Sequence, residues 1–191
     1  MAKLYFRYGA MNSGKSTELL QVAHNYGELG YDVFVIKPAV DDKGEDSIVS
    51  RLGISRPVDM LWDSESGPAC FLYPRVKRKL GCVLVDEAQF LTPEQVDALD
   101  DFVRMHDIPV IAFGLRTDFA GKGFPGSTRL LEVADKIDEI KTLCACGSKA
   151  TKHLRYIDDR LDRGGEQVVI DNKGNVRYES VCGQCFFEKM K

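Results

Sequence analysis

The chain has 191 residues, of which 44% are hydrophobic and 29% charged, and its formal net charge is −3. This length accommodates one ordinary domain plus a small addition, and the slight negative charge excludes a general attraction to nucleic-acid phosphate or to an anionic membrane. No run approaches the roughly 18 apolar residues of a membrane helix, and no apolar leader precedes the first strand, so we expect neither membrane contact nor a signal peptide. The six cysteines then indicate a reducing cytoplasm, where thiols bind metal more often than they form disulfides.

The N-terminal segment has the order of a nucleotide-binding unit. Residues 4–8 read as a short strand, and apolar residues recur near helical spacing over residues 16–29. Between them, residues 9–16 read Gly-Ala-Met-Asn-Ser-Gly-Lys-Ser, a complete G-x-x-x-x-G-K-[ST] motif. The order strand, loop, helix puts a bound phosphate at a helix N-terminus. The sequence therefore predicts a nucleoside triphosphate site, and the alternative is a turn that is merely rich in glycine.

Each residue type in this loop has a physical task. Gly9 and Gly14 allow backbone conformations that point successive N–H groups at a phosphate. Lys15 reaches the β- and γ-phosphates, and Ser16 offers its hydroxyl to Mg²⁺. The loop residues expected to bind ATP are Gly9, Ala10, Met11, Asn12, Ser13, Gly14, Lys15 and Ser16.

The following segments alternate strands with helices, which indicates an α/β fold whose sheet is mainly parallel and covered by helices on both faces. The clearest helix start is Thr92, because Pro93 and Gln95 complete a capping box, and this helix is expected to run to about residue 106. In chain order we also expect strands at residues 33–36, 82–85 and 109–115, a loop over 38–57, a weak helix over 68–80, a helix over 127–134 and a strand over 136–143.

Two acids directly follow the apolar strand at residues 82–85, in the form of a Walker B element. Asp86 lies where the strand ends and would hold Mg²⁺, directly or through water. Glu87 points to the other side of the chain and is free to accept the proton of an attacking hydroxyl group. The alternative is that the two acids merely end a strand.

Two close pairs of cysteines mark the C-terminal part of the chain. Cys144 and Cys146 form a tight C-x-C knuckle, Cys182 and Cys185 form a C-x-x-C knuckle, and 35 residues separate the two. Four thiolates suit a closed tetrahedral Zn²⁺ site, which is structural because no coordination position remains for water. The alternative is four unrelated cysteines in a reduced protein.

The pattern of strands and helices changes after residue 143 to short strand-like pieces and turns. We therefore expect two domains, a phosphate-loop α/β domain at residues 1–143 and a small zinc-ribbon-like domain at residues 144–191. Outside the motifs, we expect packed thiols at Cys70 and Cys82, surface side chains at His24 and His106, and at His153 a distant candidate for metal ligation or substrate contact.

Taken together, these motifs resemble one family, the type II thymidine kinases, which are the cytosolic thymidine kinases of bacteria and animals. The resemblance rests on Gly-Ala-Met-Asn-Ser-Gly-Lys-Ser-Thr, Val-Asp-Glu-Ala-Gln-Phe and the paired cysteines, with further matches at residues 115–124 and 178–182. It implies transfer of the γ-phosphate of ATP to the 5′-hydroxyl of thymidine, with deoxyuridine as a further acceptor, in nucleotide salvage. It also implies a lasso loop that closes over the nucleoside, a homotetramer, feedback inhibition by thymidine triphosphate, and no nucleic-acid or membrane partner.

The resemblance also implies roles for single residues. Lys15 and Ser16 match the phosphate and Mg²⁺ residues, and Glu87 matches the catalytic base. Asp86 and Gln89 match positions at the bound nucleotide, and Arg155 matches a basic residue near the site. Positions that surround thymine and its sugar are matched by Met11, Phe90, Leu115, Phe119 and Phe124, and lasso positions whose main chain reads the thymine edge by Val169 and Tyr178.

Two segments depart from the family pattern. The family's Asp-x-Arg after the second strand is replaced by Asp41-Asp42-Lys43, which keeps a charge but loses a forked donor. The lasso's usual Gly-Gly is replaced by Asp171-Asn172-Lys173-Gly174-Asn175, which leaves the register of the loop open.

A second class of function is a phosphate-loop ATPase that remodels nucleic acid through its zinc segment. The basic side chains of that segment alternate with Asp158, Asp159 and Asp162, and no series of aromatic side chains suited to base stacking accompanies them. Whether ATP consumption requires a nucleoside or a polynucleotide distinguishes the two classes. The basic or titratable side chains concerned are Lys149, Lys152, His153, Arg155, Arg160 and Arg163.

Overall fold

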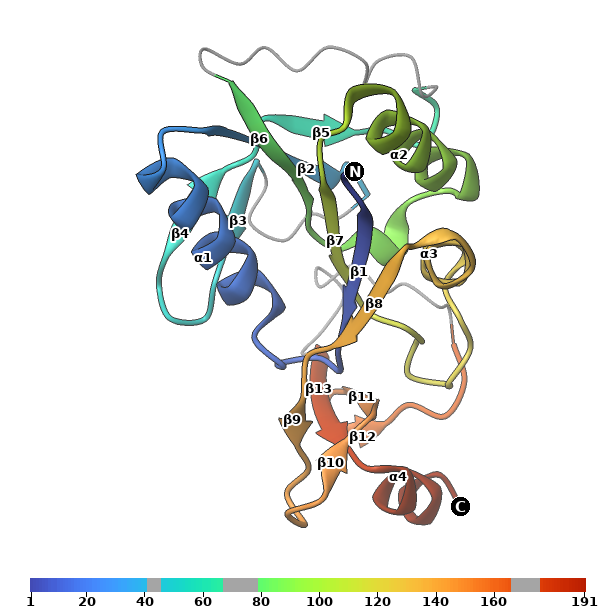
Figure 1. Ribbon diagram of the computed structural model, residues 1–191. Helices are drawn as coiled ribbons and strands as arrows, with labels where there is room; N and C mark the ends of the chain where they lie inside the picture. Colours follow the sequence, from blue (N-terminus) through green and yellow to red (C-terminus); the bar gives the residue numbers. More distant parts are fainter. Residues whose placement is uncertain (41–45, 67–78, 166–175) are drawn as a thin grey trace.

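The computed structural model describes residues 1–40, 46–66, 79–165 and 176–191. Its centre is a six-stranded sheet in which every pair of neighbouring strands is parallel (Figure 1). The predicted α/β fold with a mainly parallel sheet is thus confirmed. From edge to edge the strands are β5 (Met60–Trp62), β2 (Asp32–Pro38), β6 (Leu80–Val85), β7 (Val110–Gly114), β1 (Leu4–Tyr8) and β8 (Lys136–Glu139).

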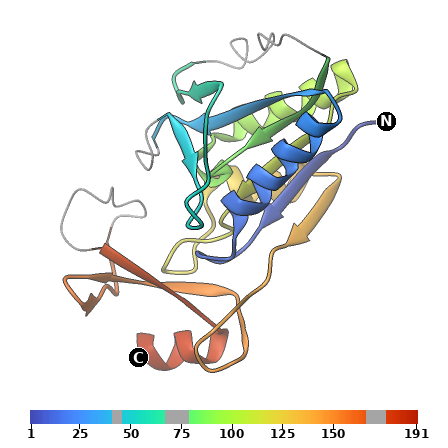
Figure 2. The same ribbon diagram turned by 90° about the vertical axis from the view of Figure 1, so that its left-hand side faces the viewer.

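Helices cover both faces of this sheet, as the continuous apolar strands predict (Figures 1 and 2). Helix α1 (Lys15–Glu28) packs Leu19, Leu20 and Ala23 against one face, where the side chains of Val35 and Leu84 lie. Helices α2 (Pro93–His106) and α3 (Pro125–Val133) cover the other face. Because neighbouring residues of a strand point to opposite faces, each central strand contributes to both cores.

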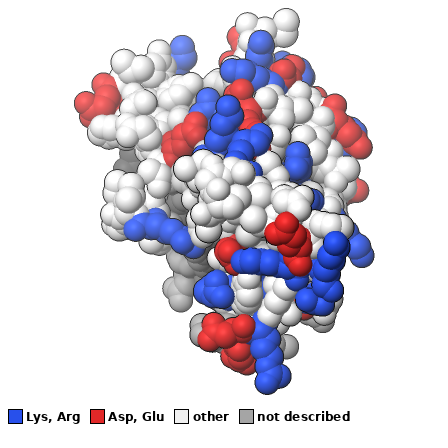
Figure 3. Space-filling model, turned by 90° about the horizontal axis from the view of Figure 1, so that it is seen from below, with Lys and Arg blue, Asp and Glu red and all other residues white. Residues whose placement is uncertain are grey.

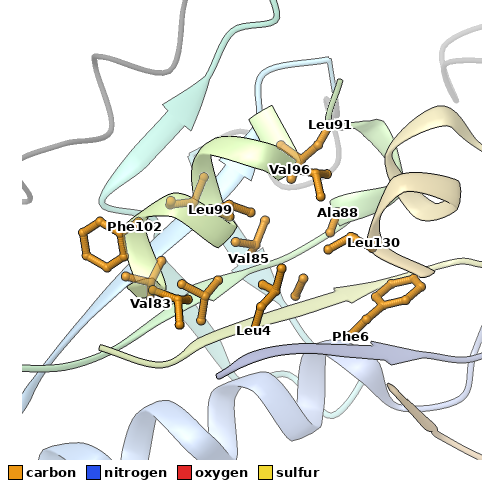
Figure 4. Close-up of a cluster of buried hydrophobic side chains, with 14 of the residues drawn as sticks. Leu4, Phe6, Val83, Val85, Ala88, Leu91, Val96, Leu99, Phe102 and Leu130 are labelled. Carbon is orange, nitrogen blue, oxygen red and sulfur yellow. The ribbon is translucent and has the colours of Figure 1, made fainter. Parts of the chain in front are cut away.

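Helix α2 shows how local signals fix an element. The amide N–H of Gln95 donates to Thr92 Oγ1 at 3.2 Å, and the N–H of Thr92 donates to Gln95 Oε1 at 3.0 Å, so the predicted capping box is present. Figure 4 shows Leu99 and Phe102 of this helix directed at Val83 and Val85 of the sheet. Burying such a side chain contributes about 1.5–3 kcal/mol, and packing therefore stabilises this face.

The prediction of a loop over residues 38–57 is wrong in its second half. A hairpin of β3 (Ser47–Val49) and β4 (Ser55–Pro57) lies there, and β5 follows it as an edge strand of the sheet. The strands have only three residues each, too few to show alternation, and burial of Ile48 and Trp62 supplies the missing stabilisation. Asp41, Asp42, Lys43, Cys70 and most of the helix expected over residues 68–80 lie outside the described residues.

The strand expected over residues 136–143 is two strands. Strand β8 ends at Glu139 as an edge of the parallel sheet, and β9 (Thr142–Leu143) pairs instead with β10 (Lys149–Ala150). The amide of Ile140 donates to the carbonyl of Tyr8, and the chain then leaves the sheet. Apolar residues occur in both strands, at Ile137 and Leu143, so the composition does not mark the change of direction.

The segment from β9 onward, called here the C-terminal lobe, lies beyond the end of the sheet at which the phosphate loop sits (Figures 1 and 2). It holds a three-stranded antiparallel sheet of β12 (Arg160–Leu161), β11 (Lys152–Ile157) and β13 (Val176–Val181), followed by α4 (Gly183–Met190). Helix α4 was not predicted, because it is short and its first turn coincides with the second cysteine knuckle. Among the described residues, no helix is both long and apolar enough to span a membrane.

Candidate active site

The phosphate loop connects β1 to α1 through two left-handed residues. Asn12 has φ 64° and Gly14 has φ 90°, and the amide of Gly9 donates to the carbonyl of Gly114 at 3.3 Å. A Cβ atom on Gly9 would lie 2.6 Å from the carbonyl oxygen of Ile140, so only glycine fits there. Both glycines of the motif are therefore required by backbone geometry, one for its conformation and one for close approach.

Lys15 and Ser16 begin α1 and face the end of β6. The buried ammonium group of Lys15 donates to the carbonyls of Ala10 at 3.0 Å and Gly9 at 3.4 Å, which keeps it over the loop. The hydroxyl of Ser16 donates to Oδ2 of Asp86 at 3.3 Å. A hydroxyl and a carboxylate in contact are the oxygen donors that suit Mg²⁺. The structure thus brings together the two residues that the sequence proposes for this ion.

Glu87 adopts a left-handed backbone, with φ 48° and ψ 39°, at the start of the short 3₁₀ helix η2 (Ala88–Phe90). Such a conformation costs a residue with a long side chain about 1–3 kcal/mol and persists only where the surroundings enforce it. The amide of Phe90 donates to the carbonyl of Glu87 at 3.0 Å, and Nε2 of Gln89 donates to the Glu87 carboxylate at 2.6 Å. The acid is therefore held in a defined position next to Asp86.

Most of the side chains expected to surround the nucleoside gather beside η2. The rings of Phe90 and Phe124 meet edge to face, with centroids 5.7 Å apart. Leu115 ends up buried directly after β7, and Phe119 is buried under the guanidinium group of Arg155, whose Cζ lies 3.7 Å from the ring centroid. Val169 lies outside the described residues.

The C-terminal lobe contacts the phosphate loop through one face of its three-stranded sheet. The hydroxyl of Ser180 on β13 donates to the main-chain carbonyl of Met11. Opposite Ser180 on β11 is His153, whose ring meets that of Tyr178 edge to face at 6.2 Å. Arg155 lies on the same face, fully buried and paired with Asp162 at 2.6 Å. The contacts of Ser180 with Met11 and of Asp162 with Arg155 are not predicted from the sequence, because no local pattern indicates them.

His153 is a buried imidazole, and burial followed by the nearby charge of Lys15 lowers its pKa from 6.5 to about 4. Leu154, the next residue, faces the core of the lobe, so His153 points away from that core and toward the phosphate loop. The ligand atoms that cluster in the described residues are all from cysteines. His153 is thus not among the clustered possible metal ligands of the described residues, and its contact with substrate stays a prediction.

The sulfur atoms of the four paired cysteines lie within 4.8 Å of one another. The sulfurs of Cys146 and Cys182 are 3.7 Å apart. Four thiolates bound to one Zn²⁺ at about 2.3 Å would be about 3.8 Å apart, so the cluster fits a tetrahedral metal. Gly147, with φ 87°, closes the tight first knuckle. Cys82 lies elsewhere, in the core under α1, where burial raises the pKa of its thiol to about 12, as expected of a packed thiol.

The family model described as thymidine kinase matches residues 2–186 of this chain. The chain belongs to the thymidine kinase family. Among its curated relatives, the thymidine kinase of Chromobacterium violaceum is 50% identical over 97% of this chain and 98% of its own length. That of Idiomarina loihiensis is 47% identical over 100% of this chain and 98% of its own length, and that of Enterobacteria phage T4 is 43% identical over the same shares.

One solved structure that matches the chain resembles it only distantly. Bacteroides Pif1 bound to ssDNA matches with a TM-score of 0.38 and 19% identity, covering 72% of this chain and 38% of that one. A likeness of this size carries no argument about function.

Most of the site residues predicted from the sequence lie close together in the structure. The phosphate loop after β1 and the segments that follow β6 and β7 lie at the carboxyl ends of the parallel strands, next to the C-terminal lobe (Figure 1). In open α/β sheets this edge is where ligands bind. The cysteine cluster stands apart, on the far side of the lobe sheet beside α4, and does not face the site.

Proposed function

We propose that this member of the thymidine kinase family transfers the γ-phosphoryl group of ATP to the 5′-hydroxyl of thymidine, and that deoxyuridine is a further acceptor. The observation that carries the proposal is the family match over residues 2–186, together with a phosphate loop whose Ser16 contacts Asp86 beside Glu87. The relatives that match over nearly their whole length bear the name thymidine kinase. The product is thymidine monophosphate, made in nucleotide salvage.

ATP binds with its phosphates over the loop at residues 9–16, where the backbone N–H groups and the Lys15 ammonium group face the anionic oxygens. Ser16 and Asp86 would hold Mg²⁺, which when bound neutralises charge on the phosphates. Lys15 then stabilises the charge that develops on the transferred group. We expect no contribution to the chemistry from the lobe cysteines, which would hold a structural Zn²⁺.

Glu87 accepts the proton of the nucleoside hydroxyl as that hydroxyl attacks the γ-phosphorus in line. The fixed carboxylate beside η2 supports this role, because a general base must lie within hydrogen-bond reach of the hydroxyl. Apolar side chains suit a base that carries a methyl group, and those proposed to line the nucleoside site are Met11, Phe90, Leu115, Phe119 and Phe124.

The lobe completes the site in this proposal. Val169 and Tyr178 recognise the thymine edge through their main chains, and Arg155 supports Phe119 from behind. Residues 1–143 and 144–191 act as an ATP-binding domain and a nucleoside-closing domain. A homotetramer, feedback inhibition by thymidine triphosphate and a cytoplasmic location remain predictions from the resemblance and from the cysteine usage.

A nucleic-acid-dependent ATPase is the competing function. On the face seen from below in Figure 3, acidic and basic side chains are interspersed instead of forming one continuous basic stripe. Binding to a polyanion depends on neutralising a run of phosphates, which calls for such a stripe. The charge distribution therefore favours a nucleoside acceptor.

The proposal is tested by measuring phosphate transfer from ATP to a panel of nucleosides and, in parallel, ATP consumption with single-stranded DNA and RNA. Thymidine should be the preferred acceptor, and polynucleotides should have no effect. Glu87→Gln should lower kcat by about 10²- to 10⁴-fold, because a positioned base is lost. Lys15→Ala should abolish ATP binding, whereas Ser16→Ala should chiefly raise the Mg²⁺ requirement. Stimulation by a polynucleotide without nucleoside phosphorylation would refute the proposal.

A further inference from the structure

Gln89 is a buried amide with a hydrogen-bond partner at each end. Its side chain lies in η2 and is 1% exposed. Oε1 accepts the amide N–H of Leu115 at 2.9 Å, and Nε2 donates to Oε2 of Glu87 at 2.6 Å. Since a backbone N–H can only donate, the bond to Leu115 fixes which end of the amide faces Glu87. The group presented to the carboxylate is therefore a donor.

The backbone around η2 is shaped to hold this amide in place. A Cβ atom on Gly114 would lie 2.9 Å from Oε1 of Gln89, so a glycine at the end of β7 leaves the room that the amide occupies. On the other side, a Cβ atom on Gly126 would lie 2.8 Å from the carbonyl oxygen of Ala88. Because both residues are glycines, the end of β7 and the start of α3 pack closely against η2. This packing limits the conformations open to the Gln89 side chain.

The carboxylate of Glu87 depends on this contact. Within the described residues, the Glu87 side chain forms one hydrogen bond, which it accepts from Gln89. A hydrogen bond to an ionised group is about twice as strong as one between neutral groups. It occupies one carboxylate oxygen and leaves the other to receive a proton.

The same amide ties the acid to the segment proposed to bind the nucleoside. Leu115 donates its N–H to Gln89, and its carbonyl accepts a hydrogen bond from the hydroxyl of Ser127 on α3. The main chain at Leu115 is therefore fixed on both sides. The Gln89 side chain bridges the Glu87 carboxylate and the main chain at Leu115, so it sets the distance between them.

We infer that Gln89 is a positioning residue, which acts on the reaction by aiming Glu87 at the nucleoside hydroxyl and not by holding ATP. This inference deepens the proposed function and rests on it. Misplacing a reacting group by about 1 Å can cost about 100-fold in rate. Loss of the Gln89 donor should therefore lower kcat while the affinities for both substrates remain.

The test is a double-variant cycle on the full chain with Glu87→Gln, Gln89→Met and the combined variant. Gln89→Met alone should lower kcat by about 10- to 100-fold, with dissociation constants for ATP and thymidine within about 2-fold of wild type. In the Glu87→Gln background the same change should cost less than about 2-fold, because residues that act as one unit are not additive. Equal losses in both backgrounds, or ATP affinity weakened by more than about 10-fold, would overturn the inference.

Two further variants keep the test decisive. Gln89→Glu retains the acceptor for the Leu115 N–H but places a second carboxyl group against Glu87, and two carboxyl groups this close share a proton. The rise of kcat with pH should therefore move to higher pH, which tests the contact even if Gln89→Met folds poorly. Gln95→Met is the matched control, because Gln95 is also buried and bonded at both ends, to Thr92 and to the carbonyl of Asp63, but does not contact Glu87. It should lower the melting temperature and leave kcat unchanged.

The outcomes separate this inference from the proposed function. If the wild-type protein transfers no phosphate to thymidine, the proposed function fails, and the cycle is run with the acceptor that the nucleoside panel identifies. If the wild-type protein is active on thymidine and Gln89→Met keeps its kcat, the inference alone fails.

Discussion

The α/β part of the chain and the C-terminal lobe are stabilised in different ways. The sheet has an extensive buried core on each face, with large side chains such as Phe6, Phe102 and Phe113. The buried core of the lobe has five residues, and two of them, Cys144 and Cys182, are cysteines of the cluster. A core this small rarely supports a fold by itself. Packing alone can therefore specify the α/β part, whereas we expect the lobe to need a cross-link.

Loss of the proposed Zn²⁺ should have the largest effect. Cys182→Ala removes one of the four proposed ligands, and binding of a structural Zn²⁺ would contribute about 10 kcal/mol to folding. The lobe should unfold and thymidine affinity should be lost, while the α/β part should still bind ATP. Metal content and separate ATP and thymidine binding on the purified variant measure this.

Cys82→Ala is the control for this prediction, because Cys82 is also buried but lies under α1, away from the cluster. It should retain the metal and thymidine affinity. If Cys182→Ala loses its metal and still binds thymidine normally, the lobe does not depend on the cross-link.

A cavity in the α/β core should destabilise the α/β part and leave the C-terminal lobe unaffected, which is the opposite of the effect expected for Cys182→Ala. Leu99→Ala removes a fully buried side chain of α2 that packs on the sheet, and such changes cost about 2–5 kcal/mol. Urea denaturation should show a lower midpoint for the α/β part. Metal content in the absence of urea should stay at its wild-type value, and its loss would show that the two parts are not independent.

The contact between the two parts should make stability depend on pH. Burial holds the pKa of His153 at about 4, below the ordinary 6.5, so between these values the unfolded chain binds more protons than the folded one. Stability should therefore fall as the pH drops through this window, by at most about 3 kcal/mol. His153→Gln should lack this part of the dependence, as measured by urea unfolding at a series of pH values.

His106→Gln supplies the control, since His106 lies exposed at the end of α2. This variant removes an imidazole away from the contact between the two parts, so it shows the effect of losing a histidine in general. A His153→Gln protein with the wild-type pH dependence would mean that His153 is not kept neutral by the contact.

The smallest effect is expected at the surface of the lobe. Lys189 on α4 forms an ion pair with Glu179 on β13 at 2.8 Å, and its hydrogen bond is the main cause that holds the pKa of Glu179 below its usual value. Both side chains are partly exposed, so Lys189→Ala should cost only about 0.5 kcal/mol. The loss should be present at neutral pH and vanish as the pH falls through the pKa of Glu179, because a depressed carboxyl pKa stabilises only while the group is ionised. Thermal unfolding of the wild type and the variant at neutral and acidic pH measures it, and an equal loss at both would exclude the ion pair as its cause.

Sequence reasoning succeeded where the signal is local. The phosphate loop and the capping box of α2 are written in neighbouring residues, and the strands around Val35 and Leu84 show continuous apolar runs. It failed where stabilisation comes from distant residues. The hairpin that carries Ile48 has strands too short for a pattern, and helix α4 is indistinguishable from a knuckle turn by composition alone.

The same distinction applies within the site. The residue types of the phosphate loop and of the two acids after β6 indicate their chemistry directly. In contrast, Gln89 accepts a hydrogen bond from the main chain of Leu115, which is 26 residues away. No spacing rule indicates such a contact. The lasso position Val169 and the role of Lys43 stay predictions, because they lie outside the described residues.

The left-handed backbone at residue 87 has a consequence for engineering. Five residues other than glycine have a positive φ in the described parts of the chain, and the four besides Glu87 are Asn12, Asp107, Asp158 and Asp159. Asparagine and aspartate tolerate this conformation because their short side chains bond to the local backbone, and glycine tolerates it because it has no Cβ. Glutamate has neither advantage. Stability and turnover therefore make opposite demands on residue 87, and searches for heat-resistant variants should select against the acid at this one position.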